Sequence, residues 1–403
     1  MTVIVIGDIS STNLGDPILT LSAEHIVNRM KTQYGNIDNV KVFDIAGRVG
    51  KKIPSEEKMC KIDSALYEQS KSEKQILDEY RSANFRSFIK WILKEKKIFR
   101  NRLISVVEKN DDNVFVIAGG ALLSRSLFYA IRLNEIVRVA HEIGGKVIFN
   151  AMGIEKCSTF AFSRFLTKKF LAKKEVVAFS TRDHVEDVPM LTSRDDFKKQ
   201  IADPGIWSAE AFNIQKKESD IVGIGTISLE AYKSILSEDK RAENVTVQSL
   251  FEFWYGITQS LDEKGQKWKM FTNGGAKDCR MAYSFLNQYG YSVDDQLLIP
   301  AENPEELVEQ ISQFKAIAAH RLHALIIATS LYIPVVPLVW SNKLVKFSEM
   351  INNEYFYWPD FENSTAVANL LSGEIFNRDF SEKIKKCKSS SEEFIYNSIV
   401  EKN

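Results

Sequence analysis

The sequence predicts an α/β protein made of two doubly wound domains in tandem. Short apolar runs alternate with longer helical patterns along the chain, which is the order typical of βαβ units. The apolar runs are continuous rather than alternating, as expected for parallel strands that are covered on both faces. A chain of 403 residues also exceeds what one hydrophobic core usually supports, so we expect more than one domain.

The first domain is predicted to comprise residues 1–207. Helices are expected at 17–33 and 127–143. The predicted strands are TVIVIG (2–7), VKVFDI (40–45), VFVIAGG (114–120), KVIFNAMG (146–153) and VVAFST (176–181). The segment near 46–113 is less regular and rich in Lys, Glu and Ser, so we interpret it as a basic insertion in this domain.

The polar stretch 208–220 has no apolar period and is predicted to link the first domain to a second one, residues 221–403. The second set of predicted strands is IVGIGTIS (221–228), KWKMFTNG (267–274), LLIP (297–300), KAIAAH (315–320) and PVVPLVW (334–340). Helical patterns lie at 245–264, 276–289, 304–313, 322–331 and 341–352. We expect the last helix to pack back on the first domain. Because open α/β sheets bind ligands at the carboxyl ends of their strands, two such domains predict a ligand cleft between them.

Bulk composition excludes several classes of protein. The formal net charge is zero, so no global field points to nucleic acid as a partner. No apolar run approaches the roughly 18 residues of a membrane span, and the N-terminus lacks the basic region of a signal peptide. These features predict a cytoplasmic location. The four cysteines show no CxxC spacing and no ligand cluster is visible, so we expect no metal.

The turn after the first predicted strand, GDISSTNLGDPIL, opens into a helix at Asp16 and Pro17. Proline is favoured in the first turn of a helix, and the free N–H groups there can bind an anion or a hydroxyl-rich ligand. A simple capped turn explains the pattern equally well. Asn13 and Asp16 are the candidate binding residues of this turn.

Two glycines, Gly119 and Gly120, follow the predicted strand at 114–118. Paired glycines allow the close approach of a ligand or of a neighbouring helix, and packing is the commoner reason for them. The later GIGTIS, residues 223–228, lacks the third glycine of a dinucleotide fingerprint and the acidic residue expected about 20 positions on. We therefore predict no nicotinamide site.

Arg182 lies just past the end of a predicted strand in FSTRDH, residues 179–184. Its guanidinium matches the geometry of a carboxylate or a phosphate, which makes it a candidate anion ligand. A structural Arg–Asp pair at a helix cap is equally consistent with the pattern.

The stretch AAHRLHALIIATSLYIPVVPL, residues 318–338, is the most unusual in the chain. Two of the five histidines, His320 and His323, flank Arg321 at a predicted strand-to-helix junction. Because a buried arginine without a partner is costly, we expect a negative group to meet Arg321. Together with the positive end of the helix, Arg321 and His323 predict a site for a small dianion. His320, at the strand end, is predicted to be structural.

Taken together, these motifs resemble the polysaccharide pyruvyl transferase family. The resemblance is carried by STNLGD (11–16), VFVIAGGALLS (114–124), STRD (180–183), ADP (202–204) and AAHRLHALIIATSLYIPVVPLVWSNKLVKF (318–347). Their order and spacing fit from about residue 7 to about residue 350. The sequence departs from the family in AMGIEK, where a glycine-rich turn with proline is common, and in having two glycines rather than three after residue 117.

The resemblance implies a GT-B-like fold, in which two Rossmann-like domains face a cleft, with the acceptor on the N-terminal side and the donor on the C-terminal side. It implies transfer of the carboxyethylidene group of phosphoenolpyruvate onto two sugar hydroxyls, with release of phosphate and no cofactor. By the motif match, Arg321, Leu322 and His323 fall on the donor site, and Arg182 is the candidate second donor arginine.

The chemistry of this reaction agrees with the residues that the motifs supply. Phosphoenolpyruvate carries a carboxylate and a phosphate, so its site needs at least two cationic groups. The methylene carbon gains a proton and two hydroxyls lose theirs, which calls for an acid–base residue with a pKa near the working pH. His323 is the candidate for that role. The candidates on the acceptor side are Asn13, Asp16, Gly119 and Gly120.

The segment NFRSFIKWILKEKKIFRNRL, residues 84–103, carries seven basic residues against a single acid, Glu95, with aromatic and aliphatic residues interleaved. A basic amphipathic helix of this kind can lie on an anionic membrane surface, for example at the inner face of the plasma membrane, where a polyprenyl-diphosphate-linked acceptor would be found. A surface helix that packs its apolar face on the domain is the simpler interpretation.

Two rival functions fit the predicted fold. A GT-B glycosyltransferase with a nucleotide-sugar donor would need an acidic residue for the base and ribose beside the RLH turn, and none is evident there. A non-catalytic module descended from such an enzyme would be favoured by loss of the Arg or His, and both are present.

Overall fold

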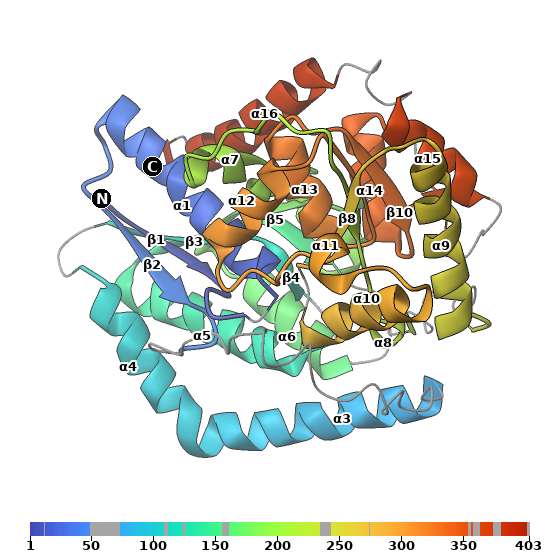
Figure 1. Cartoon of the computed structure of the whole chain (residues 1–403). Coiled ribbons are helices and arrows are strands. Elements are labelled where there is room, and N and C mark those ends of the chain that lie inside the picture. The colour runs from blue at the N-terminus through green and yellow to red at the C-terminus, as the bar shows by residue number, and fades with distance from the viewer. Residues whose placement is uncertain are drawn as a thin grey trace.

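The computed structural model of the chain describes residues 1–11, 13–48, 73–108, 112–123, 126–154, 161–233, 243–273, 275–353, 356–357, 363–373 and 380–400. It contains two parallel β-sheets flanked by helices (Figure 1). Each sheet is built from strands that alternate with helices along the chain, in the order that the apolar runs predict.

The N-terminal sheet has six strands, in the order β2-β1-β3-β5, with β4 and β6 also paired to β5. These strands are β1 (Thr2–Gly7), β2 (Asn39–Asp44), β3 (Asn113–Ile117), β4 (Gly120–Leu123), β5 (Lys146–Ile154) and β6 (Val176–Thr181). All pairs are parallel, so the carboxyl ends of these strands meet at one edge.

The C-terminal sheet has five parallel strands in the order β11-β10-β9-β7-β8. They are β7 (Val222–Gly225), β8 (Trp268–Phe271), β9 (Ala316–Ala319), β10 (Val335–Val339) and β11 (Phe356–Tyr357). Every residue of β7, β9 and β10 is buried, which accounts for the continuous apolar runs in the sequence.

Helices cover the sheets and form the connections between strands. The N-terminal helices are α1 (Gly15–Tyr34), α3 (Glu73–Lys90), the π-helix η1 (Trp91–Glu95), α4 (Lys96–Val106), α5 (Leu127–Ile143) and α6 (Ala161–Leu171). Short turns follow as η3 (Val185–Met190), η4 (Asp195–Phe197), η5 (Pro204–Trp207) and α7 (Ser208–Ala211). The later helices are α8 (Leu229–Lys233), α9 (Val247–Glu263), α10 (Ala276–Gln288), α11 (Val293–Gln296), α12 (Pro304–Ser312), α13 (Leu322–Ser330), α14 (Asn342–Ile351), α15 (Ser364–Ser372) and α16 (Ser381–Val400).

Three details differ from the sequence prediction. The strand expected at 114–120 ends at Ile117, because Gly119 and Gly120 adopt left-handed backbone angles, and β4 then resumes the pairing. LLIP (297–300) forms no strand; only Leu297 makes an isolated bridge to Met270. Within the predicted insertion 46–113, residues 73–106 are continuously helical, whereas 49–72 and 109–111 lie outside the described residues.

Two helices connect the halves of the molecule. Helix α16 crosses the top of the molecule in Figure 1 and buries one face against the N-terminal sheet, through Ile384, Cys387, Phe394, Ile395 and Ile399. The first turns of α1 pack the other way, since Leu14 and Ile18 belong to the hydrophobic core of the C-terminal half. The start of α1 is therefore held firmly against that half.

Candidate functional site

The strand-to-helix junction after β9 separates the two histidines of the HRLH motif. His320 is fully buried, accepts a hydrogen bond from Trp254 Nε1 at Nε2 (3.2 Å) and lies with Nδ1 3.2 Å from the carbonyl oxygen of Leu338. Burial lowers the pKa of His320 to about 3, so its imidazole is neutral. It is a structural residue that joins α9, β9 and β10.

Arg321, at the N-cap position of α13, is held by a buried carboxylate. Its Nε and Nη2 atoms each donate to Asp278 at 2.7 Å, and Asp278 also accepts from the backbone N–H of Ser228 at 2.9 Å. The negative partner expected for Arg321 is therefore a residue of α10. Nη1 has no hydrogen-bond partner among the described residues and remains available to a ligand.

Arg182, at the end of β6, is also paired within the protein. Its Nη1 donates to Asp203, and its Nε lies 3.7 Å from a carboxylate oxygen of Asp183. All three side chains are buried. Burial alone would lower the pKa of Arg182, but the carboxylates of Asp203 and Asp183 raise it above its usual value, so the guanidinium stays charged. Both interpretations of the STRD motif, a structural pair and a positioned cation, fit this geometry.

The N-terminal ends of α1 and α13 meet across the boundary between the two halves. A Cβ placed on Gly15 would lie 1.8 Å from Nδ1 of His323, so the ring packs directly on the α-carbon of Gly15. Nε2 of His323 is shielded from solvent and has no hydrogen-bond partner among the described residues. An unpartnered buried nitrogen is uncommon and marks a position for a ligand, a water or a reacting group.

The charges around this junction act on both His323 and Asp16. Burial lowers the pKa of His323 well below its ordinary value, and the cations Arg182, Lys343 and Arg321 lower it further. Burial raises the pKa of Asp16 to about 6, against the effect of a 2.9 Å hydrogen bond from Ser11. At neutral pH the site thus combines a neutral imidazole, a carboxylate that protonates close to neutrality, and three cations.

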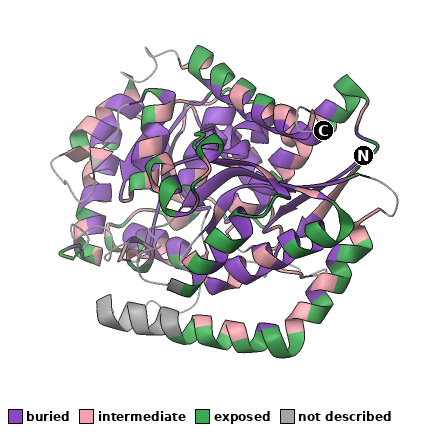
Figure 2. Ribbon diagram, turned by 180° about the vertical axis from the view of Figure 1, so that it is seen from behind, coloured by how far each residue is buried: buried purple, intermediate pink, exposed green. Residues whose placement is uncertain are grey.

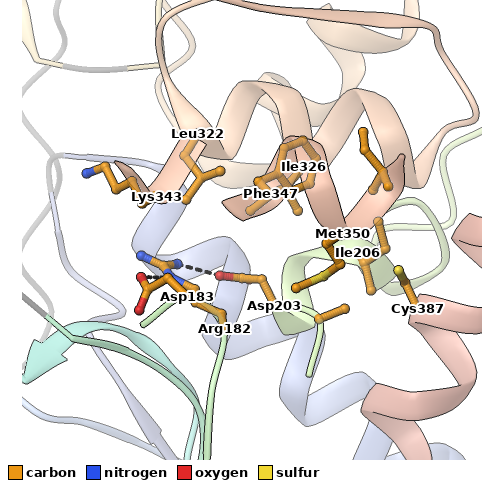
Figure 3. A pocket seen from close by; sticks show the side chains of 12 residues that line it. Arg182, Asp183, Asp203, Ile206, Leu322, Ile326, Lys343, Phe347, Met350 and Cys387 are labelled. Atoms are coloured by element: carbon orange, nitrogen blue, oxygen red, sulfur yellow. Dashed lines mark hydrogen bonds and ion pairs between the residues drawn. The ribbon is translucent and has the colours of Figure 1, made fainter. Parts of the chain in front are cut away.

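A small cavity of about 20 Å³ lies along the same boundary, with room for about one water molecule (Figure 3). Its charged end is formed by Arg182, Asp183, Asp203 and Lys343. Apolar side chains of η5, α13, α14 and α16 line the rest, among them Leu322. Figure 3 shows Lys343 and Leu322 on the C-terminal side, opposite Arg182 and its two carboxylates.

The predicted acceptor residues lie at the edge of the N-terminal sheet. Gly119 has φ 82°, and a Cβ there would come within 3.0 Å of backbone oxygens of β5, so conformation and packing explain this glycine. The carbonyl of Gly120 and the guanidinium of Arg182 flank Gly153, each 3.1 Å from where its Cβ would be. Asn13 precedes α1, and its carbonyl accepts from the N–H of Asp16 at 3.0 Å.

Three functional candidates emerge only from the structure. Lys343 lies in the SNKLVKF motif, but nothing in the sequence places it opposite Arg182. Gly15 belongs to the STNLGD motif, but its contact with His323 is formed only by the fold. Asp278 carries no local signal, because it is separated from Arg321 by 43 positions. Among the described residues, no group of three or more His, Cys, Asp or Glu side chains is arranged to hold a metal ion.

Comparison with known proteins identifies the family. The family model described as polysaccharide pyruvyl transferase matches residues 13–342. The chain belongs to this family. The match runs from Asn13 to Asn342, so it covers most of the motifs discussed above but ends before Lys343. Membership indicates a transferase that acts in polysaccharide modification. No curated protein matches the sequence of this polysaccharide pyruvyl transferase family member.

Solved structures similar to this family member extend over the whole chain. A UDP-GlcNAc 2-epimerase from Methanocaldococcus jannaschii has a TM-score of 0.57 at 11% identity, covering 100% of this chain and 99% of that chain. S. aureus MnaA, in a structure with UDP, has a TM-score of 0.52 at 10% identity, covering 99% and 95%. The epimerase from Neisseria meningitidis, bound to UDP-GlcNAc, has a TM-score of 0.51 at 11% identity, covering 100% of both chains. At these identities the likeness shows the fold alone, and it confirms the GT-B-like architecture.

Proposed function

We propose that this family member transfers the carboxyethylidene group of phosphoenolpyruvate onto two hydroxyls of a saccharide, forming a pyruvate ketal and releasing phosphate. The observation that carries the proposal is the shielded, unpartnered Nε2 of His323, surrounded by the charges of Arg182, Lys343 and Arg321 at the boundary between two α/β halves. A small anion that carries a carboxylate, a phosphate and a double bond that can be protonated suits this combination of groups.

The donor meets three kinds of positive group in this proposal. The free Nη1 of Arg321 and the ammonium of Lys343 bind the phosphate and the carboxylate, with help from the N–H groups at the start of α13. Arg182, which lies opposite Lys343 (Figure 3), is the second donor arginine, and Asp203 and Asp183 fix its position. Because phosphoenolpyruvate is larger than the cavity of about 20 Å³, its entry requires the two halves to separate along this boundary.

The proposed reaction uses His323 first as a base and then as an acid. Neutral His323 takes the proton of one acceptor hydroxyl and delivers it to the methylene carbon of the donor. The hydroxyl oxygen bonds to carbon 2, the bond from carbon 2 to the phosphate oxygen breaks, and the second hydroxyl then closes the ketal. Its proton leaves with the phosphate, so atoms and charge balance without a cofactor. The negative donor offsets the neighbouring cations and raises the pKa of His323 while it carries the proton.

The acceptor binds opposite the donor in this proposal, at Asp16, Asn13 and the backbone of Gly119 and Gly120. Asp16 accepts a hydrogen bond from one of the reacting hydroxyls. The saccharide is carried on a polyprenyl diphosphate at the inner face of the plasma membrane, which residues 84–103 contact. No helix in the part of the chain that is described has the length and apolar character of a membrane span.

A nucleotide-sugar glycosyltransferase is the alternative, because the similar structures include MnaA with UDP and an epimerase bound to UDP-GlcNAc. Thermal-shift measurements with phosphoenolpyruvate, UDP-sugars and GDP-sugars separate the two functions. Pyruvyl transfer predicts a rise in melting temperature with phosphoenolpyruvate alone. A rise with a nucleotide sugar and none with phosphoenolpyruvate would favour glycosyl transfer instead.

The kcat/KM for the acceptor is expected to fall as the pH drops below about 6. The pKa of Asp16 is raised to about 6, and its carboxyl group, once protonated, no longer accepts a hydrogen bond from the sugar hydroxyl. The measurement is kcat/KM for the acceptor against pH at saturating phosphoenolpyruvate. Asp16→Asn should have lower activity and should lack the decrease in kcat/KM at acidic pH that Asp16 causes. Ionisation of the donor affects both proteins equally. If the decrease in kcat/KM at acidic pH is unchanged in Asp16→Asn, Asp16 is excluded as its cause.

A further inference from the structure

The helical arm formed by α3, η1 and α4 runs along the outer edge of the molecule (Figure 1). One of its faces is part of the core. Trp91, Phe99 and Leu103 are buried, and Phe88 packs against the same cluster. Arg132 of α5 lies over the ring of Trp91 at 4.8 Å and binds Glu95 at 2.6 Å, which fixes the π-helical turn against the body. The interpretation of residues 84–103 as a surface helix that packs its apolar side on the domain is therefore correct for this face only.

A second apolar stripe on the same arm faces solvent. Phe85 is 66% exposed, Ile92 57% and Leu93 73%, and Ile89 lies between them at 41%. Their spacing of four, three and one residues puts them on one side of the helix, away from Trp91. Solvated helices rarely carry four large apolar side chains in a row on their outer side, so this stripe requires an explanation. Figure 2 shows the mainly exposed outer surface of the arm.

A basic stripe runs beside the exposed apolar one. Arg86, Lys90, Lys94 and Lys97 are exposed and recur at intervals of four, four and three residues. Lys94 and Lys97 form no ion pair with any described residue. Lys96 and Arg100, in contrast, turn toward the body and pair with Glu135 of α5 at 3.7 and 3.0 Å. The arm thus separates cations that serve the fold from cations that face outward.

Helix α6 extends the apolar surface. The ring of Phe162 meets Phe88 edge-on with centroids 5.6 Å apart, and Phe165 stacks on Phe162 at 6.4 Å. Phe162 and Phe165 are nevertheless about half exposed, and the exposed Lys168 and Lys169 follow them one to two turns later. Two elements distant in sequence therefore contribute the same combination of aromatic and basic side chains.

We infer that this outer surface of the arm and α6 docks on an anionic lipid bilayer, with Phe85, Ile89, Ile92 and Leu93 entering the headgroup layer. Exposed apolar side chains flanked by lysines are typical of helices that lie in the interface of a membrane. A second copy of the chain with its arm antiparallel to the first is disfavoured, because that two-fold contact would bring each basic stripe beside its own counterpart. This inference rests on the membrane contact in the proposed function and names the surface that makes it. It does not depend on the donor chemistry.

Vesicle sedimentation tests the surface with the full-length protein. The vesicles contain phosphatidylcholine alone or with phosphatidylglycerol, at low and high salt. The parent should sediment with the anionic vesicles at low salt only.

Ile92→Ser/Leu93→Ser should weaken partitioning at least tenfold. Lys94→Ser/Lys97→Ser should weaken it about 25-fold, at about fivefold per lysine. Matched controls are Ile299→Ser, at a site 66% exposed elsewhere, and Lys383→Ser/Lys386→Ser on α16; both should partition like the parent.

Three results would overturn the inference: no sedimentation of the folded parent with anionic vesicles at low salt, equal sedimentation of both patch variants and the parent, or a dimer in size-exclusion chromatography that Ile92→Ser/Leu93→Ser abolishes. Unchanged melting temperatures of the variants show that these surface changes leave the fold intact. The assay contains no phosphoenolpyruvate, so a negative result here is distinguishable from a failure of the proposed transfer reaction.

Discussion

Replacing His323 by alanine is expected to lower kcat for ketal formation by about 10²- to 10⁴-fold, the usual contribution of a positioned acid–base residue. The variant should still bind phosphoenolpyruvate, because the cations around the site remain. Release of phosphate from phosphoenolpyruvate in the presence of acceptor measures kcat, and calorimetry measures donor binding. If His323→Ala keeps kcat within about tenfold of the parent, His323 does not carry the proton.

Gly15→Ala tests the same imidazole without removing it. The added Cβ would lie 1.8 Å from Nδ1, so the ring must move, and a displacement of this kind can cost about 10²-fold in rate. Helix propensity alone favours alanine over glycine by about 1 kcal/mol, so a rate loss would come from the ring rather than from the helix. Gly275→Ala is the matched control, because a Cβ there meets nothing within 4 Å.

Arg182→Ala is expected to lower the free energy of unfolding by about 3–5 kcal/mol, since it leaves the carboxylates of Asp203 and Asp183 buried without their cation. Urea unfolding measures the loss. Lys198→Ala removes an ion pair between Lys198 and Asp195, whose side chains are 43% and 87% exposed, and should cost no more than about 0.5 kcal/mol. A loss below about 1 kcal/mol for Arg182→Ala would mean that the buried pair does not support the fold.

Much of the fold could be predicted because parallel strands buried on both faces leave continuous apolar runs. The predicted strand VVAFST coincides with β6, and the predicted helix at 127–143 coincides with α5. The prediction failed where something other than apolar composition decides where a strand forms or ends. The glycine backbone angles end β3 early, and LLIP, although apolar, contributes one bridge rather than a strand.

The candidate site was predictable only where its residues share a local motif. The HRLH stretch marked Arg321 and His323, and the strand ends marked Arg182 and Asp16. The ionic partners of the arginines could not be found in this way, because Asp278 and Asp203 reach them through tertiary packing. The amphipathic pattern of 84–103 likewise could not reveal that Trp91 faces the core while Leu93 faces solvent.

Calorimetric titration of phosphoenolpyruvate into the parent and into Arg321→Ala measures donor binding at the proposed site. We expect the parent to bind phosphoenolpyruvate and Arg321→Ala to lose about 2 kcal/mol or more of binding free energy, on the scale of a charged hydrogen-bonded pair that loses one partner. A change in circular dichroism would show whether removing the partner of Asp278 had disturbed the fold. A folded parent that does not bind phosphoenolpyruvate, with or without a saccharide acceptor, would exclude phosphoenolpyruvate as the donor.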